Sequence, residues 1–587
     1  MRRMNHLAFR QFMPYLTKFK LENACATILG ILSGLASVFL TYYIGLAIDQ
    51  MIGRNQVDFS RLSQIIYAFI GLVVINVVGQ WLIQRLGNRV AYLSISQLRK
   101  DAFEHLNQLP LRFYDQTAHG NIMSRFTNDM DNISTAIQAI YTQLFSGVTI
   151  VIIALIIMIK MNLLLTIVVL IATPIIFLAS WLVAKISQKD FSAQQAILGE
   201  ISSFITEMVG NQKVVKAFQR EAINQQRFET LNQELYYKGY KAQFSSAIAN
   251  PLSRFVDHLA YVAVGCVGGY LAITHPSLVS IGTVSSFTIY SSQFSKPFIE
   301  LTGLTTQIQT ALAGIERTFA LMNEPIEKNT ENAQILQNVS GEVCFQDVDF
   351  SYLANQPLIE HFSFTAKPGQ SIAIVGKTGA GKSTLVNLLM RFYDVDHGSI
   401  RIDQQDIRQF TRDSLRQAFG MVLQDTWLFD STLRENLRYG KPDASDEEIY
   451  DALKQAYMYD FVMRLPQKLD TPIGQHGLKI SDGQRQLLTI ARTMISNPPM
   501  LILDEATSSV DTLTERKIQA AFLAMMKGKT SFVIAHRLAT IQNADQILVM
   551  DHGKIVEQGN HHELLAKNGY YAELYHAQFT QTSEIGQ

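Results

Sequence analysis

The first half of the chain alternates long apolar stretches with polar ones. Ala24–Ile48 carries no charged side chain and is long enough to cross a hydrocarbon core of roughly 30 Å as a helix. We predict six such spans, the last two having the shortest uncharged cores. They are Ala24–Ile48, Leu62–Gln84, Asn132–Ile159, Met161–Ala184, about Arg254–Thr274 and about Ile281–Ser295. The pattern indicates an all-helical membrane domain.

The connections between these stretches are alternately short and long. The two long ones, residues 85–131 and 185–245, are polar and compatible with helix. They also carry most of the positive charge close to the membrane ends, for example Arg85, Lys185 and Lys241. Positive charge next to a span favours the cytosolic side. We therefore expect a cytosolic N-terminus and spans that continue as helices well into the cytosol.

After about Pro325 the pattern changes to short apolar runs that alternate with helical segments, which is typical of an α/β domain. Three of these runs read as buried strands that lead into polar residues. They are Ser371–Val375 before a glycine loop, Met500–Leu503 before Asp504 and Glu505, and Ser531–Ala535 before His536. The predicted domains are a membrane domain over 1–325, a linker over 326–338, a nucleotide-binding domain over 339–577 and a tail over 578–587.

The glycine loop after Val375 fits G-x-x-x-x-G-K-[ST], the pattern of a phosphate-binding loop. A buried strand before it and good helix formers after it are the context that this loop needs. Lys382 can reach the β- and γ-phosphates, and the Ser383 hydroxyl can take a Mg²⁺ position. The residues expected at the phosphates are Gly376, Lys377, Thr378, Gly379, Ala380, Gly381, Lys382, Ser383 and Thr384.

A second candidate anion site lies at the start of a predicted helix. Ser481 and Gln484 have the spacing of a capping box, and Gly483 lies between them. A helix N-terminus can bind phosphate. Taken alone, the segment is more simply interpreted as a capped helix without a ligand.

Composition excludes some functions. The 50 Lys and Arg residues balance 50 Asp and Glu residues, and no basic run is present, so nucleic acid is not an expected partner. The three cysteines are far apart and predict neither a disulfide framework nor a zinc site. Beside the fifth span, Arg254, Asp257 and His258 have helical spacing. We favour a structural Arg254–Asp257 pair over a substrate contact there.

Together these features resemble a half-transporter of the ABC exporter family, in which six spans precede one ATPase domain. Gly376–Thr384 resembles the Walker A motif, Leu501–Glu505 the Walker B motif and Ile480–Gln484 the signature motif, in the family's order. Further matches are Tyr352 to the aromatic residue that stacks on adenine, Gln424 to the Q-loop glutamine, Ser508–Asp511 to the D-loop and His536 to the switch histidine. The implied fold class is multidomain, an all-α polytopic membrane domain followed by an α/β P-loop ABC ATPase domain.

The resemblance implies ATP and Mg²⁺ as cofactors. Glu505 takes the position of the general base, and His536 that of a donor to the γ-phosphate. Lys382 and Gln424 complete the implied catalytic set. Ser383, Gln424 and Asp504 are the implied Mg²⁺ residues. The adenine contact falls to Tyr352, and the contacts to the ATP of the other subunit fall to Ser481, Gly483 and Gln484.

In this family the signature of one subunit covers the ATP held by the other, so a second ABC half-transporter is the implied partner. Here the signature has Ile480 and Asp482 where the family usually has Leu and Gly, and Gln475 stands where Glu is common. The Walker motifs match the family pattern, whereas the signature differs from it, and this combination favours a heterodimer over a homodimer. Two short helices, expected near Asp115–Ser124 and Gly210–Phe218, would connect the ATPase motion to the spans.

The implied function is export of an amphipathic drug or lipid across a bacterial cell membrane, with membrane lipids around the protein and the ATPase domain in the cytosol. A homodimeric lipid flippase and an ATP-gated channel or regulator are the alternatives. A peptide exporter with an N-terminal peptidase is not expected, because the residues before Ala24 leave no room for one.

Overall fold

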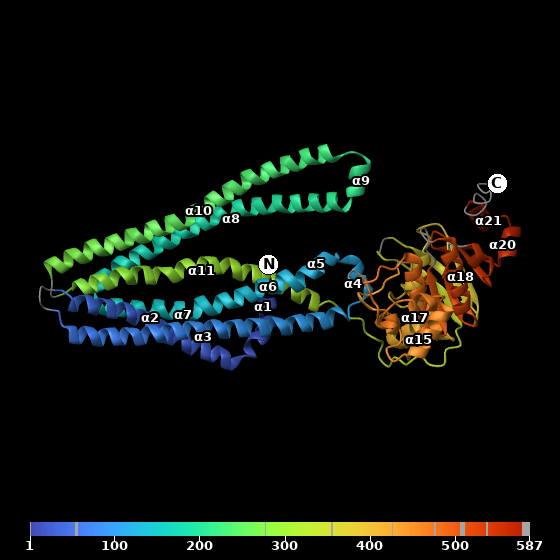
Figure 1. Ribbon diagram of the computed structural model, residues 1–587, viewed down its shortest axis with the longest axis horizontal. Helices are drawn as coiled ribbons and strands as arrows, with labels where there is room; N and C mark the ends of the chain where they lie inside the picture. The colour runs from blue at the N-terminus through green and yellow to red at the C-terminus, as the bar shows by residue number, and fades with distance from the viewer. Residues whose placement is uncertain are drawn as a thin grey trace. The chain divides into compact units, whose positions relative to one another are not determined.

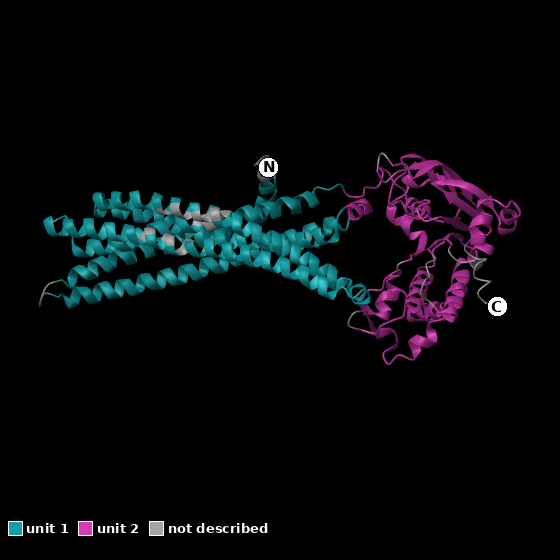
Figure 2. Cartoon of the chain, turned by 90° about the horizontal axis from the view of Figure 1, so that it is seen from above, with its two compact units in different colours: residues 1–109, 117–325 teal, residues 110–116, 326–587 magenta. Residues whose placement is uncertain are grey.

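The computed structural model describes the backbone of residues 2–52, 57–275, 278–353, 356–424, 426–474, 477–504, 511–535 and 538–577. The chain forms two compact units, coloured separately in Figure 2. Unit 1 comprises residues 1–109 and 117–325, and unit 2 comprises residues 110–116 and 326–587. The predicted tail over 578–587 and the site residues Glu505 and His536 lie outside the described ranges.

Every secondary-structure element described in unit 1 is a helix (Figure 1). Its elements are α1 (Arg2–Thr17), α2 (Lys20–Gln50), α3 (Phe59–Leu106), α5 (His119–Ser124), η1 (Arg125–Asp129), α6 (Met130–Ala139), η2 (Ile140–Leu144), α7 (Phe145–Met161), α8 (Leu163–Gly210), α9 (Gln212–Ala217), α10 (Glu221–Thr274) and α11 (Ile281–Met322). The segments from α5 to α7 follow one another without a break, and η1 and η2 are π-helical turns within this rod. Each predicted span falls within one long helix, except that the fourth begins at Leu163 instead of Met161.

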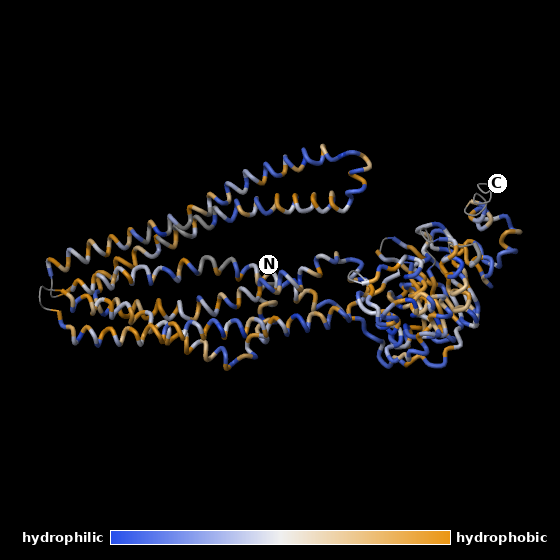
Figure 3. The backbone as a smooth tube through the Cα atoms, in the orientation of Figure 1, coloured by the Kyte–Doolittle hydropathy of each residue, from blue (hydrophilic) through white to orange (hydrophobic). Residues whose placement is uncertain are grey.

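Three helices in the described part of the chain are long and apolar enough to cross a membrane, namely Lys20–Gln50, Phe59–Leu106 and His119–Met161. Shorter apolar stretches, Leu163–Ile175 and His258–Thr274, lie within α8 and α10. Figure 3 shows that α8 and α10 become more hydrophilic toward α9. The polar connection over 185–245 is therefore helical extension, as the sequence predicts.

Small residues allow the helices of unit 1 to approach closely. A side chain at Gly34 of α2 would lie 2.6 Å from Thr149 Cγ2 of α7. Arg317 of α11 donates through Nε to Asp129 of η1 over 2.8 Å, and this Asp129 side chain is buried. Small residues at helix interfaces are common in membrane bundles, and a buried charge is usually paired. Sequence analysis did not identify the Asp129–Arg317 pair.

Both segments predicted as short connecting helices contain helix, and the first is divided between two helices. α9 (Gln212–Ala217) lies within the predicted Gly210–Phe218. The predicted Asp115–Ser124 covers the end of α4 (Leu111–Gln116) and all of α5, because the helix is interrupted at residues 117–118. Pro110 directly precedes α4, where its fixed φ suits the start of a helix. The short helix α4 belongs to unit 2 (Figure 2).

The rest of unit 2 is an α/β fold built on two main sheets. An antiparallel sheet has the order β2-β1-β4-β5, from β1 (Val343–Phe350), β2 (Ile359–Ala366), β4 (His397–Ile402) and β5 (Gln405–Asp406). The central sheet has the order β12-β11-β3-β10-β9-β6, from β3 (Ser371–Gly376), β6 (Phe419–Val422), β9 (Met500–Asp504), β10 (Thr530–Ile534), β11 (Gln546–Asp551) and β12 (Lys554–Gly559). The predicted buried strands are confirmed as β3, β9 and β10.

Helices cover the central sheet and bury its apolar strands. The helices are α12 (Lys382–Leu389), α13 (Arg412–Gln417), α14 (Leu433–Arg438), α15 (Asp446–Gln455), α16 (Tyr459–Met463), α17 (Asp482–Ser496), α18 (Thr512–Met526), α19 (Leu538–Gln542), α20 (His561–Ala566) and α21 (Tyr570–Tyr575), with a small β7–β8 pair (Ser431–Thr432 and Pro472–Ile473). Strands β3, β10, β9 and β6 are parallel, and Ile534 is in register with Ile374 and with Asp504. Parallel pairing brings the carboxyl ends of these strands to one edge of the sheet, where open α/β sheets bind ligands.

Candidate nucleotide-binding site

The loop between β3 and α12 has the backbone geometry that its glycines permit. Gly379 and Gly381 have φ values of 86° and 95°, a region that disfavours other residues. At Gly376 a side chain would lie only 2.3 Å from the Met550 carbonyl oxygen of β11. The loop ends at Gly381, which is the N-cap of α12. Its backbone N–H groups and the helix N-terminus together provide an anion-binding surface.

Lys382 is the buried cation of this loop. Its side chain is 8% exposed, and Nζ donates to the carbonyl oxygens of Gly376 at 2.7 Å and Lys377 at 3.0 Å. Burial lowers the pKa of Lys382, while the charge of Asp504 acts in the opposite direction. An ammonium held among loop carbonyls complements the charge of a triphosphate. Among its neighbours, Ser383 is exposed and Thr384 is buried.

The other predicted Mg²⁺ residues lie at the ends of neighbouring strands. Asp504 ends β9, and Gln424 follows β6 by two residues. The two strands are parallel, with Val422 in register with Leu503. Together with Ser383, they offer a carboxylate, an amide and a hydroxyl oxygen, which is a donor set that suits a hard cation such as Mg²⁺. The residues present therefore fit the ion.

Tyr352, predicted to contact adenine, is anchored beside the loop. Its hydroxyl accepts from Asn387 Nδ2 at 3.0 Å and donates to Thr384 Oγ1 at 3.5 Å, both on α12. Its ring packs edge-to-face against Phe350 at 4.9 Å and against Tyr393 at 5.0 Å between ring centroids. The half-buried Tyr352 is thereby held next to the phosphate loop. Sequence analysis did not single out Tyr393.

The signature segment starts α17 as the sequence predicts. Ser481 is the N-cap and accepts from the Gln484 N–H at 3.3 Å, while the Gln484 side chain accepts from the Ser481 N–H at 3.2 Å. This confirms the capping box. Leu487 of α17 and Leu385 of α12 belong to different hydrophobic clusters of unit 2.

Asp482, which stands where the family's signature usually has glycine, has a counter-charge within the same helix. Its Oδ1 lies 3.1 Å from a guanidinium nitrogen of Arg485, one turn further on. Such an i,i+3 pair offsets part of the repulsion between this carboxylate and a phosphate. Sequence analysis missed Arg485, although the spacing Asp-x-x-Arg was visible. Gln475 lies outside the described residues.

Glu505 and His536, the two remaining predicted catalytic residues, lie outside the described residues, and so does the stretch 508–510 of the D-loop. The described residues that precede Glu505 and His536 are Asp504 and Ala535. Asp511, the last D-loop residue, is the N-cap of α18 and accepts from the N–H groups of Leu513 and Thr514.

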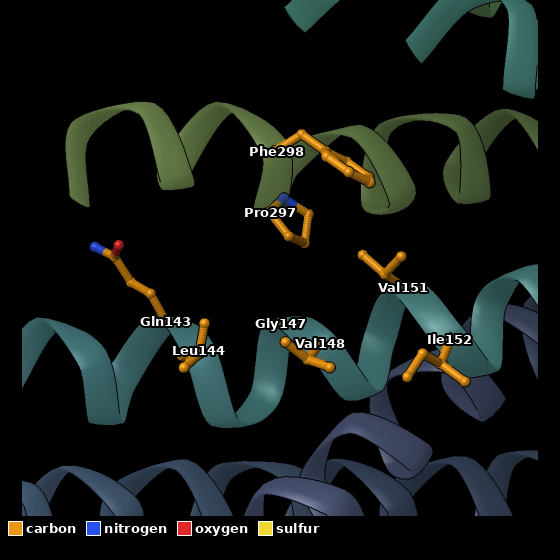
Figure 4. A pocket seen from close by; sticks show the side chains of 8 residues that line it. All are labelled: Gln143, Leu144, Gly147, Val148, Val151, Ile152, Pro297 and Phe298. Carbon is orange, nitrogen blue, oxygen red and sulfur yellow. The ribbon is translucent and has the colours of Figure 1, made fainter. Parts of the chain in front are cut away.

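In unit 1 an apolar cavity of about 160 Å³ lies between α7 and α11 (Figure 4). It occurs where both helices are irregular, next to the π-turn η2 and at Pro297. Its lining residues are Gln143, Leu144, Gly147, Val148, Val151, Ile152, Pro297 and Phe298. The Gln143 Oε1 atom is buried without a hydrogen-bond partner among the described residues.

The predicted charged cluster beside the fifth span is described only in part. Arg254 and His258 are exposed on α10, whereas the Asp257 side chain lies outside the described residues. The Arg254–Asp257 pair therefore stays a prediction.

Two family models match the chain. "ABC transporter transmembrane region" matches residues 24–298, and "ABC transporter" matches residues 359–508. Both matches agree with the division into a helical part and an α/β part.

Several known proteins are similar along nearly their whole length. The chain is 38% identical over 571 residues to the uncharacterized ABC transporter ATP-binding protein YfiC of Bacillus subtilis, covering 97% of this chain and 94% of that protein. It is 40% identical over 521 residues to the fatty acid ABC transporter ATP-binding/permease protein of Mycobacterium tuberculosis, with coverage of 89% and 82%. It is 35% identical over 578 residues to the ATP-dependent lipid A-core flippase of Pasteurella multocida, with coverage of 97% and 98%.

One solved structure is similar in sequence and in fold. It is the structure of a bacterial Atm1-family ABC exporter with ATP bound, which shares 29% sequence identity and a TM-score of 0.78. The similarity covers 96% of this chain and 98% of that chain.

Proposed function

Because the chain belongs to the ABC transporter family, as a half-transporter whose membrane domain is fused to one ATPase domain, we propose that it exports a lipid or another amphipathic compound from a bacterial cell. ATP binding and hydrolysis coupled to transport follow from the family. The substrate class is the proposed part, and the apolar cavity between α7 and α11 is the observation that carries it.

The ATPase roles that we propose follow the geometry of the loop and the strand ends. Lys382 binds the β- and γ-phosphates, and Tyr352 stacks on the adenine. Ser383, Gln424 and Asp504 hold Mg²⁺, which when bound neutralises phosphate charge. Glu505 orients the attacking water and accepts its proton, and His536 donates to the γ-phosphate. The second half of the phosphate site comes from Ser481, Gly483 and Gln484 of the other subunit.

The exposed apolar side chains of each unit support a dimer. Val214 of α9 and the following Phe218 are 54% and 72% exposed. In unit 2, a groove of about 470 Å³ beside the signature includes Trp427, which is 71% exposed, and Leu478. Exposed apolar surface of this kind marks an interaction site. We infer that α9 of each subunit docks in this groove of the partner.

We infer that the partner is a different half-transporter. Lys382, Asp504, Glu505 and His536 retain everything that the chain's own ATP needs, whereas Ile480 and Asp482 change the signature that serves the partner's ATP. The Asp482–Arg485 pair reduces the repulsion but leaves a side chain where a glycine would face phosphate. In a homodimer this altered signature would face both ATP molecules, so the unfavourable carboxylate would occur at both sites.

Expression of this chain alone tests the partner and the transport function. We expect the purified chain to show little ATPase activity and no outward lipid transport in vesicles until a second half-transporter is supplied. A stable homodimer with full ATPase and transport activity would show that the partner is a second copy. ATP-dependent ion conductance without lipid transport would favour the channel alternative.

Filling the apolar cavity is expected to reduce substrate stimulation of the ATPase. A Cβ at Gly147 would lie 3.5 Å from Pro297 Cβ, so alanine fits there, whereas phenylalanine would occupy the cavity. In phospholipid vesicles that contain oleate, Gly147→Phe should lose most of the stimulation by oleate and keep its basal ATPase rate. Gly147→Ala is the matched control. Equal stimulation of both variants would place the acyl chain elsewhere.

A further inference from the structure

A continuous set of contacts connects α4 with the adenine end of the proposed ATP site. Tyr393 donates a hydrogen bond from its hydroxyl to the Asp115 carboxylate of α4. The Tyr393 ring lies 5.0 Å from the Tyr352 ring with an interplanar angle of 89°. Tyr352 is in turn bonded to Asn387 and Thr384 on the helix that follows the phosphate loop. All these residues lie in unit 2.

The aromatic cluster restrains both tyrosine rings. Phe350, at the end of β1, contacts Tyr352 at 4.9 Å and Tyr393 at 5.6 Å between ring centroids. Edge-to-face pairs have preferred geometries, so a rotation of one ring disturbs the others. Tyr393 is half-buried, and burial together with the bond to Asp115 raises the pKa of its hydroxyl, which therefore stays a donor at neutral pH.

Among the described residues, the Asp115 side chain pairs with the Tyr393 hydroxyl. It is exposed and lies near the end of a six-residue helix. The chain on either side of residues 110–116 belongs to unit 1, whereas α4 itself belongs to unit 2 (Figure 2). A displacement of α4 acts directly on the Tyr393 hydroxyl through the Asp115 bond.

We propose that Tyr393 is a positioning residue whose ring holds Tyr352 in the orientation that stacks on adenine. Because the Tyr393 hydroxyl is bonded to Asp115, this orientation depends on the position of α4. The position of the first connecting helix then changes the affinity for ATP at the base end of the nucleotide, remote from the phosphates. By linkage, bound ATP restrains α4 to the same degree. The proposal rests on the proposed stacking role of Tyr352.

A double-mutant cycle on the complete transporter in phospholipid vesicles tests the proposal. Tyr393→Phe keeps the ring and removes the hydroxyl, and Asp115→Asn keeps the shape and removes the charge. Each should raise the KM for ATP by roughly 5-fold, the size of an ordinary net hydrogen-bond contribution, with kcat unchanged, because Tyr393→Phe removes the bond and Asp115→Asn weakens it. The double variant should show no larger rise than either single one. Tyr457→Phe, which removes an exposed hydroxyl elsewhere in the unit, is the control.

The outcomes separate this proposal from the ATP-site assignment. If Tyr352→Ala raises the KM for ATP while Tyr393→Phe and Asp115→Asn do not, Tyr352 stacks on adenine and the route through Tyr393 is refuted. If the two single effects multiply in the double variant, the residues act independently and the proposal is likewise refuted. If Tyr352→Ala leaves the KM unchanged, both the stacking role and the proposal are wrong. Equal thermal unfolding midpoints for all variants exclude a general loss of stability as the cause.

Discussion

A Glu505→Gln variant is expected to bind ATP and to hydrolyse it at least roughly 10²-fold more slowly, the range of a lost general base. In the sequence Glu505 directly follows Asp504, and Asp504 ends β9 at the sheet edge where β3 ends in the phosphate loop. Glutamine has the same shape but cannot accept the proton of the attacking water. Steady-state phosphate release and equilibrium ATP binding, measured on the same purified complex, separate the two effects.

The matched control is Glu447→Gln, an exposed carboxylate in the first turn of α15. It should hydrolyse ATP at the rate of the unmodified complex. In a heterodimer, the change at Glu505 in this chain alone should remove nearly all hydrolysis by the complex. Near-normal turnover of the Glu505→Gln complex would remove this residue from its proposed role.

Replacement of Lys382 by methionine is expected to weaken ATP binding and thereby to lower ATPase activity. Lys382 is buried and its ammonium donates to loop carbonyls, whereas the other lysine of the loop, Lys377, is exposed. A hydrogen bond to a charged group contributes about 1.5–3 kcal/mol, which corresponds to at least a roughly 10-fold weaker affinity for ATP. Titration with a fluorescent ATP analogue measures the loss directly.

Lys377 provides the control within the same loop. It is exposed, and its ammonium lies 5.4 Å from the centre of the Tyr570 ring. Lys377→Met removes the same charge from the same segment but keeps the Lys377 backbone N–H that the loop offers to the phosphates, so it should bind ATP with an affinity close to that of the unmodified protein. Equal losses in the two variants would show that net loop charge, and not the position of Lys382, determines binding.

The sequence alone determined those features that depend on local periodicity. Strands β3, β9 and β10 were predicted because buried parallel strands are near-continuous apolar runs. The capping box at Ser481 was predicted because it involves residues three apart. The phosphate loop was predicted because its conformation requires glycines at fixed places, as the positive φ values of Gly379 and Gly381 show.

Only the tertiary structure decided which distant residues meet. Asp129 and Arg317 are 188 residues apart, and Asp115 and Tyr393 are 278 apart, so no local pattern marks either pair. The position of α4 likewise followed from its packing in the ATPase unit, since a six-residue helix has too few turns for a clear apolar period. Local preferences act over a few residues, whereas these contacts form when the chain folds back on itself and brings separate segments into one core.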